Sequence, residues 1–245
     1  ATEILNSPRI VQLKRQHWND LTEDASDMVW SLFGSAVHNI LQHGKDDHHI
    51  VEQRIHVEHE GWKISGAIDL QEVYDDGIVI SDYKVTSAWV VQNEKPDWTY
   101  QLNLYAWLVE KAKGQKVKAL QIIAIVRDWS RREAKTKEGY PNAPVVVIEI
   151  PMWSFEEREA YINKRLALHN DAFFAIHSGD KMPECSAEEM WEKPTLYAIM
   201  KEGGKRAKSV HKTRDEAEAK LTAGYAIEVR EGGRTRCESF CQVSE

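Results

Sequence analysis

The residues best suited to chemistry lie in the stretch GAIDLQEVYDDGIVISDYKVTS, where Asp69, Asp82 and Lys84 interrupt two runs of apolar and β-branched residues. Asp82 and Lys84 are two residues apart, so on a strand their side chains leave the same face of the sheet. A two-residue turn centred on residues 75–76 places Asp69 opposite Asp82, and one centred on residues 76–77 places it opposite Lys84. Either register puts the three charges on one face, provided that no bulge interrupts the turn.

Two carboxylates in contact repel each other unless a cation or a shared proton lies between them. A divalent metal supplies such a cation, and carboxylate and water ligands suit Mg²⁺ or Mn²⁺. A nearby lysine can orient a nucleophilic water molecule and steady the negative charge that develops on a phosphate. The combination predicts phosphodiester hydrolysis. The alternative is a surface hairpin whose ion pairs each contribute about 0–1 kcal/mol.

Hydrophobic periodicity, turn residues and capping residues indicate the elements that must position these side chains. Their order, α-β-β-β-α-β with a further strand and helix, predicts an α/β fold in which helices flank a mixed sheet. The expected elements are a helix at 24–43, strands at 50–59, 62–74 and 78–85, a helix at 99–114, strands at 118–127 and 143–151, and a helix at 154–177.

The C-terminal quarter is expected to be a separate, smaller structure. It contains a hairpin about Gly203 and Gly204, a capped helix that stops at Gly224, and a last strand that begins at Tyr225. We therefore predict a core domain at residues 1–184 and a small ββαβ appendage at residues 185–245.

Composition narrows the classes of protein that fit. With 245 residues, 42% of them hydrophobic, the chain suits one globular domain with an appendage. No apolar run is long enough to span a membrane and no secretory leader is visible, so a cytoplasmic setting is expected, in a bacterium or a phage-infected host cell. The formal net charge of -7 argues against a general nucleic-acid binder, although the stretches at 127–137 and 201–214 are locally basic.

Four short motifs carry a family resemblance. They are GSAVH on the first helix, GAIDL on the second strand, SDYKV on the third strand and QLNLY on the following helix. In this order and on these elements they resemble the motifs of the RecB-type nucleases of the PD-(D/E)XK superfamily, over roughly residues 30–110. The resemblance implies a PD-(D/E)XK nuclease core for the larger domain.

The resemblance also implies roles for single residues. His38 looks like the metal ligand on the helix, Asp69 and Asp82 like the ligands on the second and third strands, and Lys84 like the catalytic lysine. The backbone carbonyl of Tyr83 would be a further metal contact.

Gln101 and Tyr105 resemble the family's helix motif beside the site. Their i, i+4 spacing independently puts both on one face of a helix, and Gly34 and His38 obey the same rule. Glu52 begins the first strand and is a candidate for a further carboxylate of the site, but the preferred interpretation is an exposed acid at a strand end, so it is left out of the expected site.

The basic stretch after the strand at 118–127 is a candidate DNA-binding loop. An aromatic ring can stack on a base while basic side chains meet phosphates. The expected residues are Arg127, Trp129, Arg131, Arg132, Lys135 and Lys137.

Three cysteines, Cys185, Cys237 and Cys241, bracket the predicted appendage. An odd number argues against a disulfide framework. Some relatives with RecB-type nuclease domains hold an iron-sulfur cluster with four cysteines, and the arrangement here is similar except that a fourth cysteine is missing. An iron-sulfur cluster, a zinc site completed by a histidine, and three ordinary reduced thiols remain open alternatives.

These observations predict a divalent-metal-dependent deoxyribonuclease. The resemblance fits best an exonuclease in DNA recombination, repair or phage DNA processing. We expect it to act on DNA by itself, as an oligomer, or with a partner such as a single-strand annealing protein. Two alternatives are a CRISPR-type adaptation nuclease and a non-catalytic DNA-binding module. The intact set of acids and lysine disfavours the second.

Overall fold

The computed structural model describes residues 2–22, 24–26, 28–41, 43–44, 48–93 and 95–244. Contacts within the chain divide it into two compact units, Ala1–Leu5 with Thr22–Asn170 and Asn6–Leu21 with Asp171–Glu245. The domain boundary at residue 184 stays a prediction, and the contact-defined division falls within helix α7 (Phe155–Ser178) instead.

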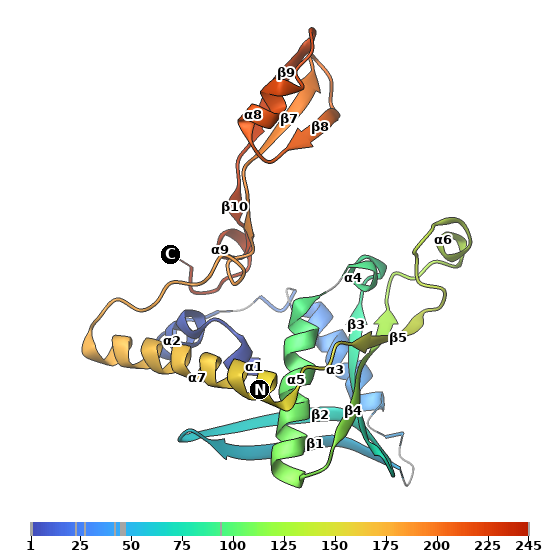
Figure 1. Cartoon of the computed structure of the whole chain (residues 1–245), viewed down its shortest axis with the longest axis vertical. Coiled ribbons are helices and arrows are strands. Elements are labelled where there is room, and N and C mark those ends of the chain that lie inside the picture. Colours follow the sequence, from blue (N-terminus) through green and yellow to red (C-terminus); the bar gives the residue numbers. More distant parts are fainter. Residues whose placement is uncertain are drawn as a thin grey trace. The chain divides into compact units, whose positions relative to one another are not determined.

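The first unit is built on a five-stranded sheet in the order β1-β2-β3-β4-β5 (Figure 1). The neighbouring strands are antiparallel except for β3 and β4, which run parallel and are joined by a helical crossover. This confirms the predicted α/β fold with a mixed sheet. The strands are β1 His49–His59, β2 Trp62–Tyr74, β3 Gly77–Thr86, β4 Val117–Val126 and β5 Val145–Ile150.

Helix α5 (Pro96–Lys113) is the main cover of this sheet and packs against all five strands. Its middle, residues 102–109, is buried all round: Trp107 and Leu108 lie in one cluster with Ile68 and Ile80 of the sheet. The helix ends where expected, because Gly114 adopts a left-handed backbone with φ of 64° and its N–H donates to the Glu110 carbonyl. The register of α5 on the sheet fixes where its polar residues meet β3.

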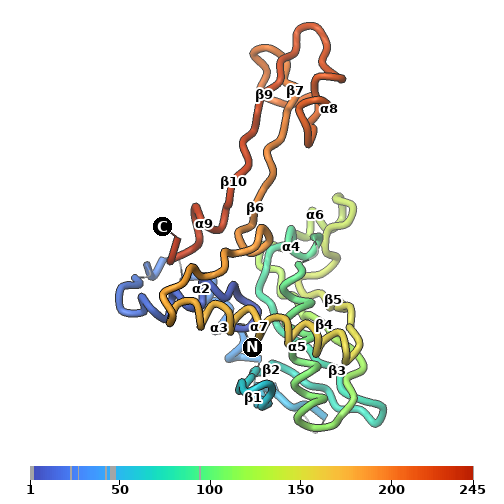
Figure 2. Tube along the Cα trace, turned by 60° about the vertical axis from the view of Figure 1, so that its left-hand side comes forward, coloured from blue at the N-terminus to red at the C-terminus, as the bar shows by residue number. Residues whose placement is uncertain are grey.

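Three further helices complete the frame of the first unit. Helix α3 (Val29–Leu41) is shorter than the predicted helix at 24–43, of which residues 27 and 42 lie outside the described part of the chain. Helix α7 begins with the predicted capping box, in which the Ser154 N–H donates to Glu157 and the Glu157 N–H donates to Ser154. Helix α1 (Thr2–Leu5) lies beside α7 in both views, where Arg165 donates to the Ile4 carbonyl (Figures 1 and 2).

Two of the short helices that were not expected from the sequence lie close to the strand ends of the first unit. Helix α4 (Ala88–Gln92) directly follows β3, and helix α6 (Arg131–Thr136) lies inside the segment predicted to be a basic loop. Each begins at a serine whose side chain accepts a backbone N–H of the first turn. Both are too short to show a hydrophobic period, so only the caps could have indicated them.

The second unit holds the predicted ββαβ order. Strand β7 lies between β8 and β9 in a three-stranded antiparallel sheet, and a short helix connects β8 to β9. The elements are α2 Pro8–Gln16, β6 Glu192–Lys193, β7 Leu196–Lys201, β8 Ala207–His211, α8 Arg214–Ala219, β9 Tyr225–Arg230, β10 Gly233–Arg234 and α9 Thr235–Ser239. Among the described residues, no helix is long and apolar enough to cross a membrane.

Candidate active site

The β2–β3 hairpin has the first of the two predicted registers. Tyr74 pairs with Gly77, so Asp75 and Asp76 form the two-residue turn, and the ladder continues in constant register to Leu70 and Ser81. The next residues along the two strands are Asp69 and Asp82. The hairpin therefore brings the two carboxylates together, as the spacing predicted.

Asp82 is held by the residues expected beside it. One of its carboxylate oxygens lies 2.6 Å from Lys84 Nζ, and the other accepts a hydrogen bond of 3.1 Å from the Gln101 amide. The same amide donates to the Tyr105 hydroxyl at 2.9 Å. Asp82 is only 2% exposed, so these contacts replace the water that the carboxylate has lost.

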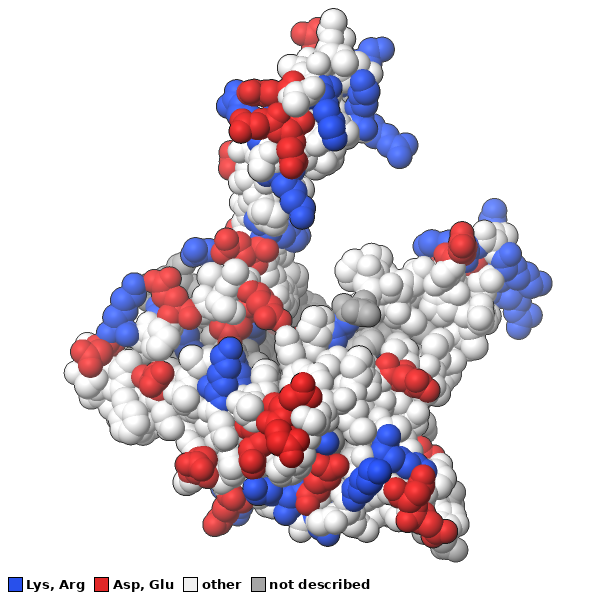
Figure 3. Space-filling view, viewed as in Figure 1, with Lys and Arg blue, Asp and Glu red and all other residues white. Residues whose placement is uncertain are grey.

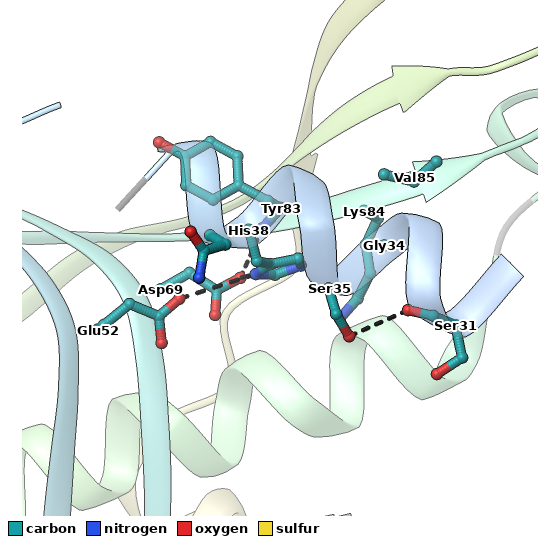
Figure 4. A pocket seen from close by; sticks show the side chains of 10 residues that line it. Ser31, Gly34, Ser35, His38, Glu52, Asp69, Tyr83, Lys84 and Val85 are labelled. Carbon is teal, nitrogen blue, oxygen red and sulfur yellow. Dashed lines mark hydrogen bonds and ion pairs between the residues drawn. The ribbon is translucent and has the colours of Figure 1, made fainter. Parts of the chain in front are cut away.

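The second group of ligand atoms gathers around His38. Its Nδ1 lies 3.4 Å from an Asp69 oxygen and 3.8 Å from a Glu52 oxygen (Figure 4). Within the described ranges these three side chains form the one set of three or more potential metal ligands whose atoms all lie within 4.8 Å of one another. The same Asp69 oxygen accepts the Tyr83 N–H at 2.9 Å, which fixes the carboxylate against β3.

Glu52 is a site residue that the sequence interpretation left out. In the β1–β2 ladder Val51 pairs with Leu70 and Gln53 with Ile68, which places Glu52 across from Asp69. Its φ of 51° is left-handed, a conformation that costs a side-chain-bearing residue about 1–2 kcal/mol and often occurs at functional sites. An acid on an otherwise ordinary strand gives no sequence signal of such a bend, which is why the residue was missed.

Burial and mutual repulsion make the two aspartates hard to ionise. Burial raises the pKa of Asp69, and the adjacent Asp82 carboxylate raises it further, to about 6. Burial likewise raises the pKa of Asp82, against the opposing effect of the Lys84 ammonium. Burial also raises the pKa of Tyr105 to about 12, so this residue stays a neutral phenol. The site thus favours any cation that neutralises its carboxylates.

These donors fit a divalent metal ion. An imidazole nitrogen with two carboxylates within 4.8 Å offers the ligand types that Mg²⁺ and Mn²⁺ accept in proteins. Asp82 does not complete this set, because its oxygens are turned to Lys84 and Gln101. Its role as a ligand, like that of the Tyr83 carbonyl, stays a prediction.

An open pocket of about 690 Å³ leads to these ligands. Helix α3 forms one wall with Ser31, Gly34 and His38, and the end of β3 contributes Lys84 and Val85 (Figure 4). Gly34 and His38 were predicted to share one face of the helix, and both line this pocket. The pocket gives a ligand direct access to Lys84.

The predicted DNA-binding segment is exposed for the most part. Its cationic side chains are all exposed. Figure 3 shows a blue group projecting from the segment that Figure 1 labels α6. One of them, Lys137, lies 3.9 Å from Glu133. DNA binding by this segment stays a prediction.

Trp129 differs from the other residues of that segment. Its indole N–H donates to the Pro141 carbonyl at 2.8 Å, and its ring packs against a small cluster built on Ala88, Val126 and Tyr140. This placement does not support stacking of Trp129 on a base, because the ring is committed to holding the segment in place.

The cysteines all lie in the second unit and are not joined by disulfides. The Cys185 thiol lies 3.1 Å from the Ser7 hydroxyl, and its pKa is raised by burial and, more weakly, by the other two cysteines. The three sulfur atoms are not all within 4.8 Å of one another. Ser7 begins helix α2 without making the usual side-chain cap and is 1% exposed. Its place beside Cys185 could not be read from the sequence.

Comparisons with known proteins agree with the fold. The family model of the PD-(D/E)XK nuclease superfamily matches residues 33–243, whereas no curated protein matches the chain. Similar solved structures include the crystal structure of SSO0001, which is 14% identical with a TM-score of 0.46 over 76% of this chain and 86% of that one. Another is the "Putative exonuclease" from Eubacterium rectale, 13% identical with a TM-score of 0.33 over 72% and 64%. With the family model spanning both the ligand cluster and the lysine, the chain belongs to the PD-(D/E)XK nuclease superfamily.

Proposed function

We propose that the chain is a Mg²⁺- or Mn²⁺-dependent deoxyribonuclease, and that it acts as an exonuclease in DNA recombination, repair or phage DNA processing. The observation that carries this proposal is that the cluster His38, Glu52 and Asp69 lines one open pocket together with Lys84, whose ammonium pairs with the buried Asp82. Membership of the superfamily and the exposed basic segment around α6 support DNA as the substrate.

Each residue has a part that follows from its contacts. His38, Glu52 and Asp69 would hold the metal ion, with Asp82 as the further ligand that the family motif implies. When bound, the ion supplies Lewis-acid activation of water and charge stabilisation on the phosphate. Lys84 reaches the same pocket and orients the attacking water, while Gln101 keeps the Asp82 carboxylate from turning away.

The test is cleavage of end-labelled single- and double-stranded linear DNA, beside a closed circle, with Mg²⁺, Mn²⁺ or EDTA. Lys84→Ala and Asp82→Ala are compared with the wild type, and Asp76→Ala at the hairpin turn controls for loss of a nearby acid. Metal-dependent loss of linear DNA, spared circles and two inactive site variants are expected. Cleavage of circles would replace the exonuclease with an endonuclease. Full activity in the two site variants would refute the assignment of the site.

We further propose that Cys185, Cys237 and Cys241 hold an iron-sulfur cluster, with zinc as the alternative. The three cysteines lie in one unit of the chain and are free of disulfides, which supports this idea. Protein purified without oxygen is expected to be coloured and to contain iron and sulfide. A colourless, metal-free sample would leave three reduced thiols.

A further inference from the structure

Trp30 lies near the start of α3, next in sequence to Ser31, which lines the active-site pocket. It is 59% exposed, although an indole gains more than most side chains from burial. The Arg127 guanidinium lies over its ring, 4.1 Å from the ring centre. Sequence analysis assigned Arg127 to phosphate binding and gave Trp30 no role.

Trp30 lies on the same face of α3 as His38. Trp30, Gly34 and His38 follow one another at four-residue spacing, so they form one row along α3. The row passes over the sheet beside His38, but β3 ends at Thr86 and β4 at Val126. Trp30 therefore lies toward the ends of these strands, where the Arg127 guanidinium lies over its ring.

A backbone hydrogen bond to the end of β3 fixes the position of Arg127. Its backbone N–H donates to the Thr86 carbonyl at 2.9 Å, which continues the parallel pairing of β4 with β3 by one residue. The guanidinium covers one face of the indole, and the exposed remainder of the ring offers an aromatic surface next to a planar fork of donors. A nucleobase suits the first and a phosphate the second.

The surface of α3 is open at Gly34, midway between Trp30 and the ligand cluster. A Cβ added to Gly34 would meet nothing within 4 Å, so the helix leaves free space midway between Trp30 and His38. Eight residues of helix separate the two side chains by about 12 Å along the axis, which corresponds to roughly three nucleotides at the spacing of a stacked strand.

We propose that Trp30 and Arg127 form a stacking site for an unpaired DNA base about three nucleotides from the scissile phosphate. The inference rests on the proposed nuclease function and gives it a substrate class, single-stranded DNA or the frayed end of a duplex. Only an unpaired base can leave its neighbours and lie on the indole, since bases within a duplex already stack on both faces.

The test measures binding in EDTA and in an Asp69→Asn background, where the strand stays intact. Single-stranded oligonucleotides carry 2-aminopurine at successive positions, and its fluorescence reports stacking while anisotropy reports affinity. Trp30→Ala is expected to weaken binding by roughly 5- to 150-fold and to abolish quenching at one position. Trp30→Phe should retain most of the affinity, and binding of a blunt duplex should not change.

The chain offers a matched control at the other end of the same strands. Lys118 at the start of β4 lies 3.9 Å from the centre of the half-exposed Tyr74 ring, a second cation–aromatic pair about 30 Å from Arg127 along the strand. Tyr74→Ala should leave single-strand binding unchanged. Equal losses in Tyr74→Ala and Trp30→Ala, or an equal loss for the blunt duplex, would overturn the stacking site.

Parallel cleavage assays on chains with Asp69 intact separate this inference from the proposed function. Metal-dependent cleavage together with unchanged binding by Trp30→Ala would overturn the stacking site alone. Trp30-dependent binding without cleavage would overturn the nuclease function and leave the stacking site standing. Absence of both cleavage and Trp30-dependent binding would overturn the nuclease function and the stacking site together.

Discussion

At the scale of single residues, the site depends on charges that the fold keeps out of water. Asp69 and Asp82 repel each other. Asp82 pairs with Lys84, and Asp69 faces His38. Such an arrangement destabilises the metal-free protein and is relieved when a cation binds. Stability and metal binding are therefore linked through the same carboxylates.

We expect Asp69→Asn to stabilise the metal-free protein at neutral pH. The pKa of Asp69 is about 6 in the folded state against 3.8 ordinarily, so the folded chain binds the extra proton and the free energy of unfolding falls as pH rises from about 4 to 6. Asparagine keeps an oxygen for the Tyr83 N–H without the charge. Urea unfolding in EDTA should show a gain on the order of 2 kcal/mol at pH 7 that shrinks toward pH 4.

Asp76→Asn serves as the control for this prediction. The Lys118 side chain lowers the pKa of Asp76, an exposed residue at the turn. Replacing Asp76 should therefore slightly lower the free energy of unfolding at pH 7. An Asp69→Asn protein that is less stable than the wild type at pH 7 in EDTA would contradict the argument.

We expect Glu52→Gln to weaken Mn²⁺ binding by roughly 10- to 100-fold, the scale of losses when groups supporting a metal ligand are removed. The amide loses the charge that draws the ion, while the backbone bend at residue 52 is retained. Calorimetric titration with Mn²⁺ measures the effect without relying on cleavage. Glu58→Gln, an exposed acid on the same strand, should bind Mn²⁺ like the wild type; equal affinity in both variants would remove Glu52 from the site.

At the scale of elements, the docking of α5 on β2 decides whether Gln101 reaches Asp82. Gly66 makes this docking close: a Cβ there would lie 2.8 Å from a Tyr105 ring carbon and 2.9 Å from a Leu108 methyl carbon. Tyr105 in turn shares the Gln101 amide with Asp82. A single glycine thus sets the register between the helix motif and the acids.

We expect Gly66→Ala to destabilise the protein by about 1–3 kcal/mol through overpacking and to reduce cleavage by displacing Gln101. Gly34→Ala is the matched glycine change, since nothing lies within 4 Å of its added methyl group. Because Gly34 lies within a helix, its replacement by alanine should raise the free energy of unfolding by about 0.5–1 kcal/mol. Thermal unfolding of both variants checks the opposite signs, and a Gly66→Ala protein as stable as the wild type would show that α5 can shift freely.

Some of these structural features could be predicted from the sequence and others could not. The hairpin, α5 and the capping box of α7 could be predicted, because turn residues, Gly114 and Ser154 act locally. The left-handed backbone of Glu52 and the contact between Ser7 and Cys185 could not, because both depend on residues distant in the sequence. The placement of Trp129 was missed for the same reason, since its partner Pro141 lies beyond α6.

At the scale of the whole molecule, an acidic chain must bind a polyanion. The formal net charge is -7, so attraction to DNA has to come from local groups such as the exposed cations around α6. The metal ion adds positive charge at the acidic site itself. Binding should therefore depend on salt more steeply than the net charge suggests.

We expect a variant with Arg131, Arg132, Lys135 and Lys137 changed to alanine to bind all DNA sequences more weakly, with a shallower salt dependence. Each lost phosphate contact lowers the slope of log affinity against log salt by about 0.9 for duplex DNA and about 0.7 for single strands. Anisotropy titrations from low to moderate salt measure this. Replacing Lys111 and Lys116, which lie elsewhere on the unit, should leave the slope unchanged, and an unaltered slope in the quadruple variant would sink the loop hypothesis.

The parallel pairing of β3 with β4 has a consequence for how the chain folds. We expect the β2–β3 hairpin, which is local in sequence, to close first and bring the two acids together, and we expect β4 to pair with β3 only once the crossover through α4 and α5 has formed. Gln101 meets Asp82 in that later step. A chain still leaving the ribosome therefore carries its paired acids before it can position them, and catalytic competence arrives only with closure of the sheet.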